Sequence, residues 1–199
     1  MKKIVVLITA VLFSALSFGQ TAKQVLDKAA AAVSSKSGVT ASFTMSSAQY
    51  GNTSGTISVK GRKFHASVPM ATMWFDGKTQ WTYMKKNNEV NVTTPTEAQL
   101  QAINPYNFIN MYKKGFKYTM TQTDKSYKVH LTATDQSRRV KEMFITVDKK
   151  TYHPTEVKLL QKQKWTTFVI SNLVTSKLPD SEFRFNSKDF PSAEVIDLR

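Results

Sequence analysis

The chain has 199 residues, a formal net charge of +14 and no cysteine. This length suits one domain with a single core, and the lack of cysteine excludes a disulfide framework, a thiolate nucleophile and a thiolate metal site. A positive excess of this size can steer a protein towards an anionic membrane surface or an acidic partner. Nucleic-acid binding is not favoured, because the basic residues form no tract. They come instead as scattered pairs at expected turns, where solvated side chains are the simpler interpretation: Lys85-Lys86, Lys113-Lys114, Arg138-Arg139 and Lys149-Lys150.

The first residues have the pattern of a secretory signal peptide. A basic start at Lys2 and Lys3 leads into an apolar run over residues 4–13, and small residues precede a cleavage expected after Gly19. The run is too short for a membrane-spanning helix, which needs about 20 residues; a retained anchor is the alternative. We therefore expect an exported protein with one domain over residues 20–199, whose charge falls from +14 to +12 once the two lysines are removed.

An amphipathic helix is predicted over residues 21–35. Thr21 can serve as its N-cap and Gly38 can end it. Such a short helix is not stable alone, so it must lie against a sheet. Apolar residues recur on one face at helical spacing: Ala22, Val25, Leu26, Ala29 and Val33.

Alternating apolar and polar residues then predict a long series of strands on both sides of residue 100. The first alternation runs over residues 39–45, and Asp76-Gly77, flanked by aromatic residues, is the strongest hairpin signal. Gly51-Asn52 and Asn87-Asn88 indicate further turns. Roughly ten or eleven strands at hairpin spacing must curl into a barrel or fold into a sandwich.

The stretch Thr94–Gly115 interrupts the strands with a helical pattern. Thr94, Pro95 and Glu97 fit an N-cap, a first helical position and a capping-box glutamate. Pro105 ends that helix, and a second short helix runs to Gly115. We interpret the pair as a lid or plug over a lipid-sized cavity, and the alternative is a connector packed on one sheet face. The plug residues would be Leu100, Ile103, Phe108, Ile109 and Met111.

The side chains expected to point inwards are mostly aromatic residues and methionines, which make a soft lining for flexible apolar guests. The same residues could equally form an ordinary packed core. The candidate lining consists of Phe43, Met45, Val59, Phe64, Met73, Phe75, Trp81, Tyr83, Met111, Met120, Met143 and Ile145.

Catalytic signatures are missing from the sequence. It contains no GxSxG elbow, no P-loop and no GxGxxG motif. His65, His130 and His153 have no metal-site spacing such as HExxH. We therefore predict a protein that is not an enzyme and that needs neither a metal nor a cofactor.

Several segments together resemble the LolA family of periplasmic lipoprotein carriers. They are VTASFTM, GTISVKGRKF, MWFDGKTQWTY, NPYNFINMY and the ending FRFNSKDFPSAEVIDLR. The resemblance covers nearly the whole expected mature chain. It implies a mostly β (α+β) fold, in which one curved antiparallel sheet of about 11 strands forms an unclosed β-barrel. An N-terminal helix and a short helical lid would close an apolar cavity.

The resemblance also implies a function. A periplasmic monomer would shield lipoprotein acyl chains, or other lipid, between an inner-membrane release complex and an outer-membrane acceptor. Arg62 is the nearest match to the arginine that fastens the family's lid, although Gly61-Arg62-Lys63 stands where the family tends to have an Arg-Pro pair. The alternatives are a lipid-binding sensor of the same fold and an exported hydrolase with a barrel pocket. The membrane-anchored receptor of this fold is excluded because it needs a lipidated cysteine.

Overall fold

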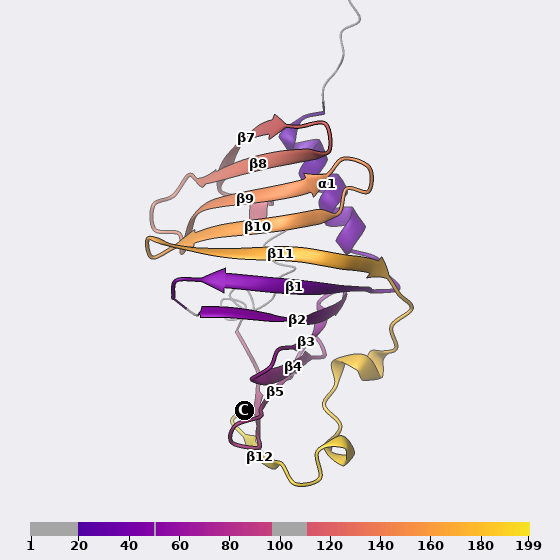
Figure 1. Cartoon of the computed structure of the whole chain (residues 1–199). Coiled ribbons are helices and arrows are strands. Elements are labelled where there is room, and N and C mark those ends of the chain that lie inside the picture. The colour runs from indigo at the N-terminus through magenta and orange to yellow at the C-terminus, as the bar shows by residue number, and fades with distance from the viewer. Residues whose placement is uncertain (1–19, 50, 97–110) are drawn as a thin grey trace, which may run out of the picture.

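A computed structural model describes residues 20–49, 51–96 and 111–199. Within these ranges, twelve strands form one strongly curved sheet, and an α-helix crosses its inner side (Figure 1). The elements are α1 (Ala22–Val33), β1 (Val39–Ser47), β2 (Gly51–Lys60), β3 (Lys63–Ser67), β4 (Ala71–Phe75), β5 (Gln80–Met84), β6 (Glu89–Thr93), η1 (Met111–Lys113), β7 (Phe116–Gln122), β8 (Ser126–Ala133), β9 (Val140–Asp148), β10 (Pro154–Gln161), β11 (Lys164–Thr175), η2 (Asp180–Phe183), η3 (Ser187–Asp189) and β12 (Glu194–Asp197).

The sheet consists of two antiparallel meanders joined side by side. Its order is β12-β6-β5-β4-β3-β2-β1-β11-β10-β9-β8-β7, so β1 pairs with β11 where the meanders meet. The outermost strands β12 and β7 do not pair with each other, and the curved sheet stays open, as predicted. The open curved sheet of about 11 strands expected from the sequence is confirmed, with one addition. The short β12 adds a twelfth strand, which is parallel to β6 and is held by backbone pairing. Its four residues lack the alternation of buried and exposed side chains that would have predicted a strand.

Helix α1 forms where its sequence predicted it. Thr21 is the N-cap, and it exchanges hydrogen bonds with Gln24 in a capping box. The predicted apolar face is buried, with Val25, Leu26 and Ala29 fully inaccessible to solvent. It packs on the inner face of β7–β10, whose buried side chains complete the larger core of the molecule.

Helix α1 lies towards one end of the sheet. The Tyr152 hydroxyl, in the turn between β9 and β10, contacts Gln20 and Lys28 at the start of the chain described here. The residues after α1 lead through Gly38 into β1 at that same end, which is the right-hand side of Figure 1. From the opposite end, the Tyr112 hydroxyl reaches across the inner face and donates a hydrogen bond to Asp27 of the helix.

The strongest predicted turn is confirmed. The Asp76 carboxylate accepts hydrogen bonds from the backbone N–H groups of Lys78 and Thr79, and this closes the turn between β4 and β5. The turn predicted at Gly51-Asn52 is wrong by a few residues, because Gly51 already pairs with Ser47 at the start of β2. Side-chain periodicity locates strands better than it locates their ends.

The predicted helical pair falls mostly outside the described residues. Thr94–Thr96 have no regular structure, and residues 97–110, which contain the plug candidates Leu100, Ile103, Phe108 and Ile109, are not described. The last turn of the second predicted helix is observed as the 3-10 helix η1, in which Tyr112 is buried. Gly115 then has a positive φ of 77°, which redirects the chain into β7.

The C-terminal segment, residues 176–193, covers the outer face of β3–β6 and is called the strap below (Figure 1). Its helix η2 lies against β3 and β4, and Phe183 of that helix is fully buried. Phe185 and Phe190 contact the Trp74 ring, at centroid distances of 5.7 and 5.6 Å. No helix in the described ranges has the length and apolarity needed to cross a bilayer.

Candidate functional site

Strand register decides which side chains face the inside of the curved sheet. Phe43 of β1 lies opposite Ile170 of β11, and Met45 lies opposite Phe168. Because directly paired residues point to the same side of a sheet, the inner face is apolar across the junction of the two meanders. The same face continues through β2, β3 and β4 with Ile57, Ala66 and Met73 in successive register.

Part of this inner face is ordinary core. Met143 and Ile145 are fully buried within the cluster that contains α1. Val59, Phe64 and Phe75 belong to a second buried cluster on β1–β4. These five candidates from the sequence do lie on the inner face, but they are packed and leave no apolar surface free.

The remaining inner-face residues are only half-buried. They include Phe43, Met45 and Met73 from the sequence prediction, together with Ile57 and Ile170. The predicted Met111 and Met120 are also half-buried and pack at the margin of the larger core. Methionine and aromatic side chains adapt their shape to irregular apolar partners. This half-buried apolar surface, centred on the β1–β11 junction, is the candidate site.

Two predicted lining residues lie on the other face of the sheet. Trp81 pairs directly with Trp74, whereas Met73 and Phe75 pair with Thr82 and Gln80. The inward placement of Trp81 is therefore corrected, and so is that of Tyr83, two residues further along. Because the side chains of a strand alternate, an error of one residue reverses the assignment of a whole strand. Tyr83 instead contacts the strap through Phe190, at a centroid distance of 4.7 Å.

The sequence prediction omitted two residues that the register places in the site. Ile57 belongs to a recognised strand pattern, and its alternation with polar neighbours was a usable signal. Ile170 follows the alternation of β11, but a bulge beside Asn172, whose φ is 52°, interrupts the period further along. Arg62, the latch candidate, is exposed in the turn between β2 and β3, and its role stays a prediction.

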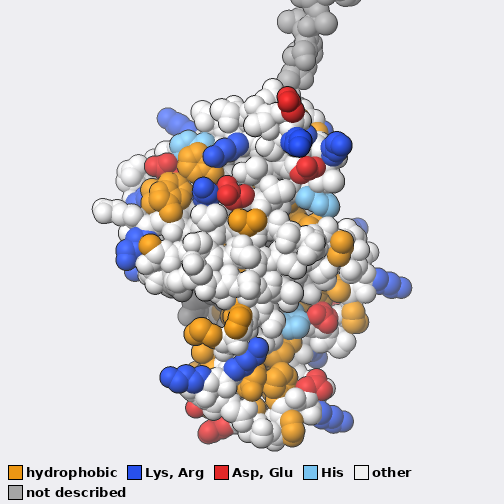
Figure 2. Space-filling view, viewed as in Figure 1, with side chains coloured by type: hydrophobic (Ala, Val, Ile, Leu, Met, Phe, Trp, Pro, Cys, Tyr) orange, Lys and Arg blue, Asp and Glu red, His pale blue; other side chains and the backbone are white. Residues whose placement is uncertain are grey.

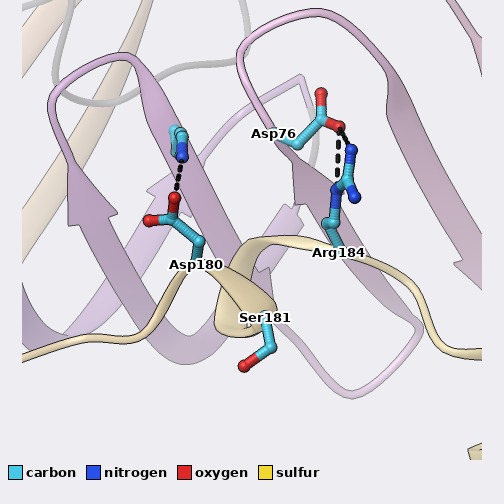
Figure 3. A pocket seen from close by; sticks show the side chains of 5 residues that line it. Asp76, Asp180, Ser181 and Arg184 are labelled. Carbon is cyan, nitrogen blue, oxygen red and sulfur yellow. Dashed lines mark hydrogen bonds and ion pairs between the residues drawn. The ribbon is translucent and has the colours of Figure 1, made fainter.

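The outer face offers a different kind of hollow, of about 450 Å³, between the strap and the β4–β5 turn (Figure 3). Arg184 of the strap points at Asp76, with 3.1 Å between the guanidinium nitrogen and the carboxylate oxygen. Asp180 reaches Lys63 at 2.8 Å and Lys60 at 3.1 Å. The charges that line the hollow are thus paired with one another, and they fasten the strap to the sheet.

These ion pairs set the acid response of the strap. The Lys63 and Lys60 ammonium groups lower the pKa of Asp180 below its ordinary value of 3.8. Burial alone would raise the pKa of Asp76, but hydrogen bonds from the N–H groups of Thr79 and Lys78 and from Arg184 outweigh it and lower that pKa. A carboxyl whose folded pKa is depressed stabilises the fold above its unfolded pKa, and loses that contribution as the pH falls through the folded pKa.

We expect acid to loosen the strap below about pH 4, where these carboxyls take up protons. A variant that keeps only Trp74 should show a change in its emission as its contacts with Phe185 and Phe190 are lost. Combining Asp76→Asn with Asp180→Asn should remove the acid step, because the new side chains do not titrate. An unchanged acid step in that variant would contradict the assignment.

The histidines do not assemble a metal site. His65 pairs with Glu182 at 2.8 Å, and His130 pairs with Glu142 at 2.9 Å. Across the described ranges, no group of three or more histidine and acidic side chains is placed to hold a metal ion.

Comparison with known proteins identifies the family. The model of the family described as outer membrane lipoprotein carrier protein LolA matches residues 14–163. The chain belongs to the LolA family. This confirms the resemblance noted in the sequence. The strap lies beyond the residues that the family model matches.

A known structure shares the fold at low sequence identity, and two others are similar at lower TM-scores. An uncharacterized conserved protein from Thermus thermophilus is 11% identical, with a TM-score of 0.60 over 89% of this LolA-family chain and 99% of the other. A LolA superfamily protein from Nitrosomonas europaea is 11% identical, with a TM-score of 0.42 over 83% and 98% of the two chains. LprF from Mycobacterium bovis is 8% identical, with a TM-score of 0.45 over 79% and 96%. No curated protein matches the chain in sequence.

Proposed function

We propose that this protein is a periplasmic carrier that holds the acyl chains of lipoproteins, or of other lipids, on the apolar inner face of its sheet. The observation that carries the proposal is the half-buried apolar surface at the β1–β11 junction, where Phe43 and Ile170 lie side by side. Membership of the LolA family supports the same cargo. An inner-membrane release complex and an outer-membrane acceptor are the corresponding partners.

The physical requirement for such a carrier follows from the cost of exposing lipid to water. Burial contributes about 0.8 kcal/mol per CH₂, so a chain of roughly 16 carbons resists leaving a membrane by about 12 kcal/mol. A carrier must replace most of that burial without binding so tightly that release fails. Half-buried methionine and aromatic side chains suit this task, because they can contact the guest and close over one another when it leaves. No bond is made or broken in this function.

The strands provide a matched test of the inner face. Phe43 and Ile170 pair with each other on the inside, and their chain neighbours Thr44 and Val169 pair with each other on the outside. We expect Phe43→Glu with Ile170→Glu to weaken binding of a fluorescent fatty-acyl probe at least about tenfold, because binding must then desolvate two carboxylates. Thr44→Glu with Val169→Glu should leave probe affinity within about twofold. Each double variant places two carboxylates opposite each other on the same pair of strands, so the repulsion between the two carboxylates is alike in both variants.

Titration of the probe by fluorescence measures both affinities, and circular dichroism checks that each variant is folded. Lack of probe binding by the unmodified protein would contradict the proposal. Equal losses in the inner and outer variants would also contradict it, since the site would then not lie on the inner face. The plug hypothesis for Phe108 and Ile109 stays a separate prediction: Phe108→Glu with Ile109→Glu should alter probe binding.

A further inference from the structure

The turns of an antiparallel meander alternate between the two ends of its strands, and in this protein the excess of basic residues is larger at one end than at the other. The turns after β5, β8 and β10, and the approach to β7, all lie at the end away from α1. The turns after β4, β7 and β9 lie at the end where α1 begins. The end away from α1 is called the basic rim below and appears at the left of Figure 1.

Three of the four basic pairs of the sequence lie along this rim, although they are far apart along the chain. Asp135 is the acidic residue found in the described turns there. At the other end, Asp76, Asp124 and Asp148 offset part of the positive charge of the basic residues in the turns. The rim residues are Lys85, Lys86, Lys113, Lys114, Arg138, Arg139 and Lys162.

Most of the rim side chains are exposed, and among the described residues none of the seven forms an ion pair with a carboxylate. Arg138 is half-buried, because its guanidinium lies over the Phe116 ring at 5.1 Å and beside Gly115. Its neighbour Arg139 is exposed. Cations in this number, most of them solvated, generate a positive potential directed outwards from one end of the molecule.

An aromatic patch on the outer face adjoins the rim. Trp165 follows the turn between β10 and β11, is 39% exposed and contacts Phe144 at a centroid distance of 5.7 Å. The Phe144 ring also stacks on His130 and lies under the Lys128 ammonium group. Hydrophobic side chains gather beside a histidine over β8–β10 in Figure 2, and basic side chains occur at the adjoining left margin. Tryptophan next to lysine is a combination suited to the interface between water and lipid headgroups.

We propose that the basic rim docks this protein onto the surface of a membrane that contains anionic phospholipid. The charges are spread over separate turn tips, and a membrane surface attracts such diffuse charge without geometric matching. A protein partner would instead be recognised through a few well-packed anchors. The inference deepens the proposed function, on which it rests, because a carrier of acyl chains has to meet membranes.

Charge reversal at the two ends provides the test. Lys86→Glu, Lys114→Glu and Arg139→Glu change three exposed rim residues, and the control variant carries Lys78→Glu, Lys125→Glu and Lys150→Glu at exposed turns of the other end. Both triple variants change the net charge by the same amount. Co-sedimentation would measure binding to phosphatidylcholine vesicles with and without about a quarter of phosphatidylglycerol, at low and high salt.

We expect the unmodified protein to bind the anionic vesicles at low salt and the neutral ones much less. The rim variant should bind the anionic vesicles on the order of 100-fold more weakly, as three basic residues near an anionic surface imply, and the control within about threefold of the unmodified protein. An equal loss of vesicle binding in both variants would overturn the proposal, because net charge alone would then explain the binding. Absence of binding to anionic vesicles by the unmodified protein would overturn it in favour of an acidic protein partner.

Acyl-probe binding separates this inference from the proposed function. The rim variant should keep its affinity for the fatty-acyl probe, because the substituted residues lie outside the apolar inner face. Failure of the unmodified protein to bind the probe would count against the carrier function, whereas failure to bind vesicles alone would count against the docking surface.

Discussion

Phe183→Ala is expected to lower the free energy of unfolding by about 3–5 kcal/mol, the usual cost of removing a buried phenylalanine side chain. Phe183 is fully buried, and its helix η2 lies against β3 and β4. Without this side chain, the strap would keep the ring contacts of Phe185 and Phe190 with Trp74 and the ion pair of Arg184. Arg184 is 67% exposed, and exposed ion pairs contribute about 1 kcal/mol or less. Urea unfolding followed by circular dichroism measures the loss.

Lys188→Ala supplies the matched control, since Lys188 lies five residues further along the strap and is exposed. It should change stability by less than about 0.5 kcal/mol. A loss below about 1 kcal/mol for Phe183→Ala would show that the strap contributes little to the folded state. The strap would then be an appendage, and β3–β6 would be stable with their outer face uncovered.

Gly55→Val is expected to destabilise the protein by about 3 kcal/mol, at the upper end of the range for overpacking. A Cβ atom at Gly55 would lie 2.1 Å from the backbone carbonyl oxygen of Ser67, and a backbone atom cannot move aside as a flexible side chain can. Gly55 also pairs with Phe43, so the close approach of β2 and the end of β3 occurs beside the candidate site. We infer that a glycine here permits the sheet to curve.

Ser54→Val is the control for this prediction. Ser54 is the preceding residue of β2 and is exposed, so valine there gains β-propensity without a clash. Denaturant unfolding should show that Ser54→Val is neutral within about 0.5 kcal/mol. If Gly55→Val were equally neutral, the proposed steric need for glycine would be wrong.

The local elements of this fold could be predicted because their signals are local. The N-cap Thr21 and the buried face of α1 follow from side chains within a few turns of one helix. The hairpin at Asp76-Gly77 follows from two residues whose conformations fix the turn. The alternation along β1 likewise indicates a strand with two different faces, although it does not tell which neighbour the strand will have.

Other features had no such local signal. The strand β12 pairs with β6 across about a hundred residues of chain, and its four residues show no alternation. The wrong inward placement of Trp81 has a related cause, since β4 carries large apolar side chains on both faces and Trp81 pairs with Trp74 on the outer one. One face is covered from inside the sheet and the other by the strap, so hydrophobicity alone does not distinguish them.

The sequence by itself determined that this chain forms a capped amphipathic helix and many antiparallel strands, and its motifs determined the LolA family. Those properties depend on periodicity and on turn residues, which act over a few positions. Only the tertiary structure decided which apolar residues stay half-buried around Phe43 and Ile170, and which basic pairs share one end of the sheet. Both depend on register and on the order of strands, which bring together residues that are far apart in the chain.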